Sequence, residues 1–485
     1  MPRYRLSSGL LAAFYTLCFG VVLPSYIDEA YTYHLATDPS LSHMLSALRN
    51  GADGSFPLFG ILAFAWAKLF GSSELGLRLT GGLFVVLLVG QMGDRLRRYF
   101  PPMPVALALL LILANRLWIH SVIQARSNGL LVFAFSLAFW STWDLIESRR
   151  VSRRRWLLHA FSCGVLWLSH PLGMLYGSIL AVLYAGFSYR RGTFSLARMT
   201  AFAGGPVLLL VWLPSFLVQR QINPVFPPGL SVPGWQKYWD FAFLESPVFF
   251  GVVLLGLALL LVTKRSGQET TDSISSPSQG EPALRSHGDL VVYAVAFVVI
   301  LNGAVAMLDA SGVAAIYLLL AVRYVLVVVV PFGILFSATL DGLEQWLRRL
   351  FRQRWSGTAI RSLRAFLALL LLLQMARMWS GWRRVKFTRE SYLNGVAQLA
   401  NEKRLDIVCA NHIDAFFLQT RTNAPEVKYV MDDDFEFRTL MLRHQRYYPE
   451  PAPISRSDAE RYPEDRVFVP LRGPAVIVKR GADAR

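Results

Sequence analysis

Cysteine is scarce in this sequence, and no two cysteines lie near each other. The 485 residues include three, Cys18, Cys163 and Cys409, and the first two stand within apolar runs. This spacing excludes a disulfide framework and a zinc-ligand pattern. A glycine-rich phosphate-binding loop is absent as well, so nothing in the chain indicates a bound nucleotide.

Charged residues are also few. They make up 17% of the chain, whereas 54% of the residues are hydrophobic. Apolar runs recur from residue 8 to residue 380, and several approach the roughly 20 residues that span a bilayer. Residues 381–485 are mixed and charged. The composition excludes an ordinary soluble protein and indicates an integral membrane protein with a polar C-terminal part.

Acidic residues are too few to balance the basic ones, and the formal net charge is +17. The basic residues cluster in short loops between apolar runs, as the positive-inside rule predicts for cytoplasmic loops. The clusters are Arg95, Arg97 and Arg98; Arg149, Arg150, Arg153, Arg154 and Arg155; Arg190 and Arg191; Lys264 and Arg265; and Arg348, Arg349, Arg352 and Arg354. A nucleic-acid surface requires one contiguous basic face with stacking aromatic residues, so nucleic acid is not an expected partner.

Placing every arginine cluster in the cytoplasm predicts the membrane topology. The first apolar run has a basic start but no small-residue cleavage site, so we expect an uncleaved first span with a cytoplasmic N-terminus. Residues 57–70 are too short to cross and are expected to form an interfacial or re-entrant helix on the outer side. About eleven transmembrane helices result, near residues 8–24, 79–94, 103–119, 129–147, 156–169, 172–188, 200–218, 246–262, 289–308, 323–341 and 361–379. The predicted fold is an all-α polytopic membrane protein with interfacial helices in its first outer loop.

Two segments depart from the helical pattern. Residues 264–288 are rich in Ser, Gly and Gln, and we expect a disordered cytoplasmic linker there. Residues 381–485 are expected to form a small extracytoplasmic α/β domain. Its predicted elements are a helix over 392–401 and strands over 405–410, 427–431, 467–471 and 475–479.

Two adjacent carboxylates, Asp28 and Glu29, follow the first apolar run where its helix reaches the outer membrane surface. Ionisable groups near a bilayer favour a functional site. A structural alternative is equally concrete, because Ser25 followed by Asp28 has the spacing of a capping box, and acidic residues suit the positive end of a helix. The two interpretations are about equally supported by this stretch alone.

With this topology, a set of polar residues converges on the outer membrane face. It comprises Asp28, Glu29, His34, Asp53, Arg78, Gln124, Arg126, Asn128, His170, Arg323 and Tyr324. Each has a structural alternative: the arginines snorkel to lipid headgroups, and His170 in a Ser-His-Pro turn is more often a hydrogen-bonded turn residue than a catalyst. The mixture of acid, base and cation is nevertheless confined to this face.

Several motifs in this set resemble a known family. They are Asp28 to His34 (DEAYTYH), Asn50 to Asp53 (NGAD) with Pro57-Leu58, Leu69 to Leu79 (LFGSSELGLRL), Gln124 to Leu131 (QARSNGLL), Ser169-His170-Pro171, and Arg323-Tyr324 with Pro331. The pattern is similar to the dolichyl-phosphate-mannose protein mannosyltransferase-like branch (glycosyltransferase family 39, ArnT-like) of the type-C (GT-C) membrane glycosyltransferases. The sequence departs from the family pattern at two places. It has a single proline at Pro57, where the family often has two, and Ser127 and Asn128 follow Arg126, where the family often has a tyrosine or aspartate.

The resemblance implies a function for the whole chain. Residues 1–380 would be the transmembrane catalytic domain, with the active-site acids in the outer loop 25–78 and residues 381–485 outside. Such an enzyme transfers a sugar, with inversion, from a polyprenyl-phosphate donor to a hydroxyl of a protein, glycolipid or polysaccharide at the outer face of a membrane. We expect that membrane to be a bacterial inner membrane.

The chemistry of this reaction indicates roles for the residues. Asp28 or Glu29 suits the general base that accepts the acceptor's proton. Arg78, Arg126 and Arg323, with Tyr324, suit the leaving phosphate, because guanidinium forks match phosphate oxygens. His34, Asp53, Gln124, Asn128 and His170 are supporting candidates. No cofactor is certain; a divalent metal held by Asp28 and Glu29 is left open, because an acidic pair holds such an ion or acts without one.

A transporter or flippase of lipid-linked sugars is the main alternative. It would also place arginines in the membrane, but transporters tend to hold ionisable residues near the bilayer midplane and to have repeated halves. The run Asp432-Asp433-Asp434 is similar to the metal-binding acids of nucleotide-sugar transferases. Those belong to soluble folds, so an acidic surface loop is the better interpretation here.

Overall fold

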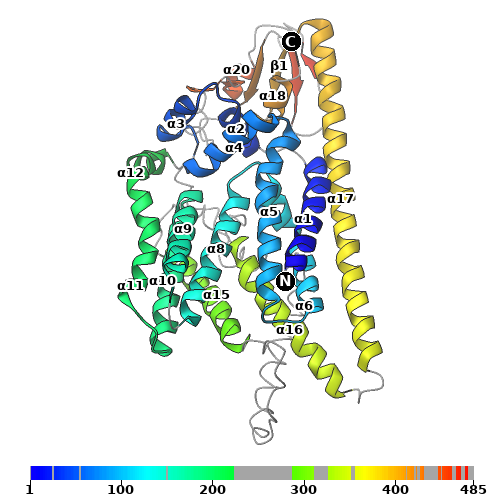
Figure 1. The fold of residues 1–485 in the computed structure, drawn as a ribbon. Coiled ribbons are helices and arrows are strands. Elements are labelled where there is room, and N and C mark those ends of the chain that lie inside the picture. Colours follow the sequence, from blue (N-terminus) through cyan, green and yellow to red (C-terminus); the bar gives the residue numbers. More distant parts are fainter. Residues whose placement is uncertain are drawn as a thin grey trace, which may run out of the picture.

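Helices make up most of the structure, which is a computed structural model (Figure 1). It describes residues 2–23, 27–53, 56–148, 151–222, 287–310, 326–350, 356–410, 412–419, 422, 426–430, 446–448, 451–460, 466–470 and 476–478. The long helices and the short elements between them are α1 (Pro2–Val22), α5 (Glu74–Leu96), α6 (Pro102–Ala114), α7 (Arg116–Ile123), α8 (Asn128–Glu147), α9 (Arg153–Ser169), α10 (Leu172–Arg190), α11 (Leu196–Met199), η1 (Thr200–Ala203), α12 (Gly204–Ile222), α15 (His287–Ala310), η6 (Leu326–Val328), α16 (Val329–Leu350) and α17 (Ser356–Lys403).

Local sequence signals set several helix ends. Ser73 and Ser152 cap α5 and α9, because their side chains accept hydrogen bonds from the backbone N–H groups of Gly76 and Arg155. Proline at the start of α6 suits its first turn, where no intrahelical N–H bond is lost. The central helix, α8, is apolar on all sides and 83% buried over its membrane-length window.

Seven described helical segments are long and apolar enough to cross a membrane. They are 74–96, 128–147, 172–190, 196–218, 287–304, 326–348 and 357–403. Shorter apolar helical segments cover 6–22, 57–70 and 102–114, and α9 has 17 residues. The predicted helical membrane protein is confirmed. The count of eleven spans stays a prediction, and the expected span over 246–262 lies outside the described residues.

A layer of three short helices lies between the long helices and the C-terminal sheet (Figure 1). It consists of α2 (Ile27–Thr37), α3 (Leu41–Arg49) and α4 (Pro57–Phe70), and α4 packs against α2. The ends of α4 are those predicted for the short helix over 57–70. This layer carries the acidic pair of the first predicted outer loop.

The C-terminal part contains a five-stranded sheet with the order β3-β2-β1-β4-β5. The strands are β1 (Asp406–Cys409), β2 (Val427–Val430), β3 (Ala452–Ile454), β4 (Arg466–Val469) and β5 (Val476–Val478); helices α18 (His412–Gln419) and α20 (Arg456–Glu460) connect them. All neighbouring strands run parallel except β4 and β5. The predicted small α/β domain therefore has a mainly parallel sheet.

The helix expected over 392–401 is the last part of α17, which has 48 residues and no proline. The predicted domain boundary at 380–381 falls inside this helix. Leu393 and Ala397 of α17 pack on Ile407 and Val467 of the sheet, and Tyr31 of α2 joins the same apolar cluster. A single helix thus connects the membrane region to the sheet, and the sheet contacts the layer that holds the acidic pair.

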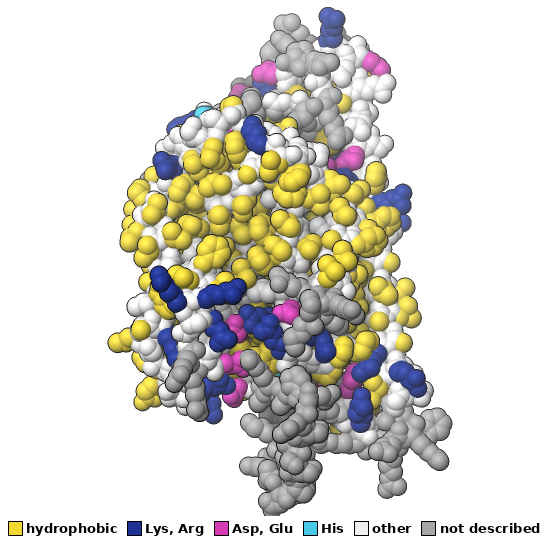
Figure 2. All heavy atoms as spheres, viewed as in Figure 1, with side chains coloured by type: hydrophobic (Ala, Val, Ile, Leu, Met, Phe, Trp, Pro, Cys, Tyr) yellow, Lys and Arg dark blue, Asp and Glu magenta, His cyan; other side chains and the backbone are white. Residues whose placement is uncertain are grey.

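A hydrophobic band separates two polar ends of the molecule (Figure 2). Large apolar side chains of α1, α12 and α17, such as Phe14, Val211 and Leu373, are more than half exposed, as expected for a surface that faces lipid. Arg95, Arg154 and Arg191 line one cavity at the end opposite the sheet. The predicted linker lies outside the described residues over 264–286, and α15 begins at His287.

Candidate active site

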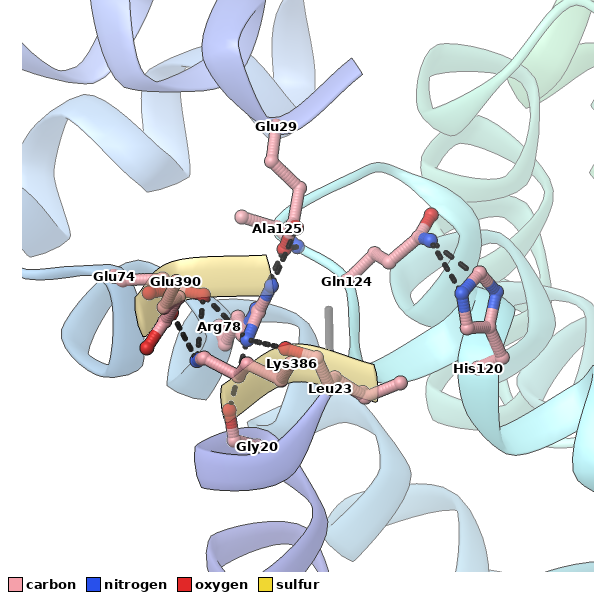
Figure 3. Close-up of polar contacts among 10 residues, drawn as sticks. All are labelled: Gly20, Leu23, Glu29, Glu74, Arg78, His120, Gln124, Ala125, Lys386 and Glu390. Atoms are coloured by element: carbon pink, nitrogen blue, oxygen red, sulfur yellow. Dashed lines mark hydrogen bonds and ion pairs between the residues drawn. The ribbon is translucent and has the colours of Figure 1, made fainter. Parts of the chain in front are cut away.

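A buried ion pair joins Glu29 of α2 to Arg78 of α5 (Figure 3). The Arg78 Nε donates to Glu29 Oε1 at 2.8 Å, and Nη2 donates to Oε2 at 2.7 Å. The backbone N–H of Ala125 also donates to Oε1, at 3.0 Å. Both carboxylate oxygens of Glu29 are therefore bound by the protein.

Arg78 binds the end of α1 as well. Its Nη1 donates to the carbonyl oxygens of Gly20 and Leu23, at 3.0 and 2.8 Å. Gly20 lies in the last turn of α1 and Leu23 directly follows the helix, where carbonyl acceptors lack intrahelical partners and favour a cation. Arg78 has no solvent exposure, and removing one partner of such a buried pair costs about 3–5 kcal/mol. The pair thus fixes where α1 ends and α2 begins.

Further ion pairs connect the Glu29–Arg78 pair to α17. Glu74 Oε1 lies 2.7 Å from Arg78 Nη1 and accepts from Lys386 Nζ at 2.9 Å. Lys386 Nζ is 3.7 Å from Glu390 Oε1. Glu74, Lys386 and Glu390 were not predicted as site residues. Glu74 and Lys386 lie 312 residues apart, and no local sequence pattern marks such a pair.

Asp53 and Arg126 form a second ion pair between the first outer loop and the turn before α8. Arg126 Nη1 donates to Asp53 Oδ2 at 2.8 Å, and Nη2 lies 3.5 Å from Oδ1. The side chain of Asp53 is 1% exposed and that of Arg126 is 16% exposed. The turn packs tightly on α5: a Cβ at Gly81 would lie 2.6 Å from the Gln124 carbonyl oxygen. Glycine at 81 is what permits this approach.

The remaining described candidates all have protein partners. Gln124 Nε2 lies 3.3 Å from His120 Nδ1, and Asn128 Nδ2 donates to the Ser121 carbonyl oxygen at 3.1 Å. His170 Nδ1 accepts from the backbone N–H of Leu172 at 3.2 Å, at the start of α10. These bonds suit structural roles, and the supporting functions predicted for the side chains stay predictions.

His34 and its neighbours connect α2 and α3 to the C-terminal part. The His34 ring stacks on Tyr448 with centroids 5.5 Å apart and meets Phe416 edge-on at 5.2 Å. The Tyr448 hydroxyl donates to Asp38 Oδ2 at 2.9 Å, and the same oxygen lies 2.6 Å from His43 Nδ1. The pKa of the Tyr448 phenol is raised, mainly by burial and to a smaller extent by the hydrogen bond to Asp38. The phenol therefore stays protonated and can donate.

Several predicted site residues lie outside the described part of the chain. Asp28 is the second residue of α2, but its side chain is not described, and Arg323, Tyr324 and Asp432-Asp433-Asp434 fall in undescribed segments. Within the described residues, no group of three or more His, Cys, Asp and Glu side chains is placed to hold a metal ion. Because both oxygens of Glu29 accept N–H donors, its present arrangement does not fit a metal ligand.

Two crystal structures share this architecture. ArnT from Cupriavidus metallidurans bound to undecaprenyl phosphate matches with a TM-score of 0.53 and 14% sequence identity, over 96% of this chain and 92% of that chain. The apo state of the same protein gives a TM-score of 0.55 at the same identity and coverage. The chain has the ArnT fold. No protein-family model and no curated protein matches the sequence.

The expected resemblance to the ArnT-like membrane glycosyltransferases is therefore confirmed at the level of the fold. The ArnT fold covers both the membrane helices and the C-terminal sheet, since 96% of the chain is matched. Individual residue roles do not follow from a fold shared at 14% identity.

Proposed function

We propose that this protein is a glycosyltransferase that moves a sugar from a polyprenyl-phosphate donor to an acceptor hydroxyl at the outer face of a membrane. The observation that carries the proposal is the clustering of buried acids and arginines at the sheet end of an ArnT fold. ArnT itself is described bound to undecaprenyl phosphate, a lipid of the class that such a donor leaves behind. A lipid-borne donor also explains why the polar cluster lies where membrane helices end.

The proposed reaction is a single displacement at the anomeric carbon. The acceptor oxygen forms a bond to this carbon as the carbon–oxygen bond to the phosphate breaks, and the polyprenyl phosphate leaves as a monoester. The acceptor's proton passes to a carboxylate, and the configuration inverts. The protein must therefore supply a base near the acceptor and positive charge near the phosphate.

We assign the base to Asp28 and a positioning role to Glu29. If Glu29 accepted a proton it would lose its negative charge, and the buried Arg78 guanidinium would lose the anionic partner that holds it. Asp28 lies in the first turn of the same helix, which the Glu29–Arg78 pair holds in place. Asp28 would thus act from a rigid support.

We assign the leaving phosphate to Arg126, together with Arg323 and Tyr324 as the sequence resemblance implies. Arg126 is oriented by buried Asp53 and keeps partial exposure. A guanidinium stays charged and matches phosphate oxygens in a fork. Arg78 is fully buried and bonded to Glu29, Gly20 and Leu23, so we propose that it acts by holding α2 rather than by touching the donor.

The proposed orientation places the arginine end in the cytoplasm of a bacterial cell and the C-terminal sheet outside the inner membrane. Basic residues concentrate on cytoplasmic loops. The acceptor is then an envelope component with a free hydroxyl, such as a protein, glycolipid or polysaccharide.

Reconstitution in liposomes tests the proposal. Undecaprenyl phosphates carrying radiolabelled hexoses or pentoses are supplied with an envelope extract, and label is followed from the lipid into the acceptor fraction. Transfer with release of undecaprenyl phosphate is expected for at least one sugar. Movement of label across the bilayer without transfer would identify a transporter and contradict the proposal.

A further inference from the structure

A polar cavity of about 780 Å³ lies at the arginine end of the membrane helices, opposite the candidate active site. Five arginines line it: Arg95, Arg98, Arg154, Arg155 and Arg191. They come from the ends of α5 and α10 and from the first turn of α9. The cavity lies within the size range of small-ligand sites.

Carboxylates offset only part of this positive charge. Asp144 and Glu147 also line the cavity. Asp144 accepts from Arg95 Nη1 at 2.8 Å, and Glu147 accepts from the Tyr99 hydroxyl at 3.2 Å. Each acid therefore already accepts a hydrogen bond from the protein, Asp144 from a cavity arginine and Glu147 from Tyr99.

Arg98 and Arg191 have acidic partners of their own, in Asp94 and Asp289. Arg154 and Arg155 differ from them, because neither has a carboxylate partner within the described residues. Arg155 Nη1 instead donates to the Ser148 hydroxyl at 2.6 Å. Two exposed arginines therefore line the cavity without a carboxylate partner among the described residues.

The start of α9 adds to the positive potential. Ser152 caps this helix, and Arg154 and Arg155 lie in its first turn. The N-terminal end of a helix carries a partial positive charge and directs N–H groups toward anions. The N-terminal end of α9 and the charges of Arg154 and Arg155 therefore both attract an anion.

An apolar surface leads from the cavity into the hydrophobic band. Leu158 lines the cavity and is 48% exposed, and Phe161 is 65% exposed. Arg154, Leu158 and Phe161 are spaced by four and three residues, so they share one face of α9. A headgroup in the cavity would place its acyl chains along this face.

We propose that this cavity is a binding site for the phosphate group of an anionic phospholipid in the leaflet at the arginine end. Basic pockets between membrane helices recognise such headgroups. Lipid bound here would join the ends of α5, α8, α9 and α10 at a place distant from the proposed transfer reaction. The site is independent of the proposed function, because it uses none of the residues assigned there.

A charge-matched pair of variants tests the proposal. Arg154→Gln/Arg155→Gln removes two cavity arginines. Arg153→Gln/Arg190→Gln removes two exposed arginines that do not line the cavity but directly precede the cavity residues Arg154 and Arg191 in sequence. Purified full-length protein is titrated with dioleoylphosphatidylglycerol or dioleoylphosphatidylcholine in mixed micelles, and bound lipid is counted by native mass spectrometry. Circular dichroism and gel filtration confirm that each variant is folded.

The cavity variant is expected to lose about 30-fold in affinity for phosphatidylglycerol, from two headgroup-facing charges, with little change for phosphatidylcholine. The control variant should lose less than about threefold. Equal losses in both variants would overturn the proposal in favour of general attraction between a basic surface and an anionic membrane. An absence of preference for phosphatidylglycerol in the wild-type protein would overturn it too.

A competition arm separates lipid from soluble phosphate. Inorganic phosphate is added to the wild-type protein at the concentration at which phosphatidylglycerol half-saturates it. Retention of lipid is expected, because the lipid also has the apolar face of α9. Displacement of phosphatidylglycerol by an equal concentration of inorganic phosphate would assign the cavity to a soluble anion. That result would overturn the proposal that its ligand is a lipid.

Discussion

Asp28 and Glu29 are adjacent in the chain, and we propose different roles for them. Glu29 is bound by a guanidinium fork and a backbone amide, and it stabilises the junction of α1, α2 and α5. Residues one position apart on a helix point about 100° away from each other, so the two acids are not expected to meet the same atom. We therefore propose that Asp28 is the reactive group and that Glu29 supports it.

The Asp28→Asn variant distinguishes catalysis from helix stabilisation. If Asp28 serves only the positive end of α2, its charge contributes about 0.3–1 kcal/mol, and the variant should retain nearly full activity. If Asp28 is the base, an amide cannot accept the acceptor's proton, and turnover should fall about 100-fold or more. Transfer rates and unfolding midpoints of the purified protein measure both effects.

Glu29→Gln is the matched comparison. It removes the buried carboxylate partner of Arg78 and leaves only the partly exposed Glu74, so stability and activity should fall together, with a loss of stability of about 3–5 kcal/mol. Asp28→Asn should lower activity alone. Full activity in Asp28→Asn would remove Asp28 as the base, and an inactive but stably folded Glu29→Gln would then exchange the two roles.

Arg126 should respond differently to loss of its charge and to loss of its fork. Arg126→Ala should lower turnover about 100-fold or more, because the leaving phosphate loses a fixed cation. Arg126→Lys keeps a charge but lacks the planar fork, so its loss should be smaller. Steady-state rates with a polyprenyl-phosphate sugar measure the difference.

Arg364 offers a control for this experiment. It forms a bidentate ion pair with Glu344, and its side chain is 23% exposed, close to the 16% of Arg126. Arg364 lies near the N-terminal end of α17, far from the sheet. Arg364→Ala should leave transfer rates unchanged. Equal, mild losses in Arg126→Ala and Arg126→Lys would show that Arg126 only reaches toward lipid headgroups.

At the level of elements, α17 connects the sheet to the site. Its Lys386 binds Glu74, which contacts Arg78, which in turn holds Glu29 on α2. Glu74 is 38% exposed, whereas Lys386, Glu29 and Arg78 are 9%, 10% and 1% exposed, so within this chain of charges Glu74 is the residue closest to solvent. α17 thus supports α2 through Glu74 and Arg78.

Lys386→Met should loosen α2 without unfolding the protein. We expect faster hydrogen exchange in the first turns of α2 and a fall in turnover of about tenfold, because small misplacements of reacting groups slow a reaction. Hydrogen exchange read by mass spectrometry, together with transfer rates, measures both. Arg384→Met removes an exposed charge from the same helix and should change neither. Unaltered exchange in α2 with Lys386→Met would show that α17 does not support the site.

The elements also show how far the sequence predicts this molecule. The ends of α4 and four strands were predicted, because proline, glycine and apolar runs mark them locally. Strand β3, with only Ala452–Ile454 and a proline, gave no alternating pattern and was missed. The continuity of α17 through residue 381 was missed because a change of composition does not by itself end a helix.

Site residues divide in the same way. Glu29, Asp53, Arg78 and Arg126 were selected because acids and arginines stand out where apolar runs end. Their pairing was not predictable, since Glu29–Arg78 and Asp53–Arg126 depend on how distant helices pack. Asp38 with Tyr448 was missed for the same reason: the two lie 410 residues apart.

At the scale of the whole molecule, the two ends differ in chemistry. The sheet end holds buried acid–arginine pairs, and the other end holds a cavity lined by five arginines, with the hydrophobic band between them (Figure 2). A protein with this asymmetry has one orientation that satisfies the positive-inside rule. That orientation puts the proposed transfer reaction on the same side as the C-terminal sheet.

Cysteine labelling in intact cells tests this orientation. Glu402→Cys places a thiol at an exposed position near the end of α17 beside the sheet, and Arg190→Cys places one at an exposed position at the arginine end. A membrane-impermeant maleimide should label position 402 once the outer membrane is permeabilised, and position 190 only after the inner membrane is opened. Two of the three native thiols, Cys163 and Cys409, are buried, and burial raises the pKa of the Cys409 thiol, which leaves little reactive thiolate; the third, Cys18, is partly buried and is measured as background in the protein without the new cysteines. Labelling at position 190 in cells with an intact inner membrane would invert the topology and place both Asp28 and the proposed reaction in the cytoplasm.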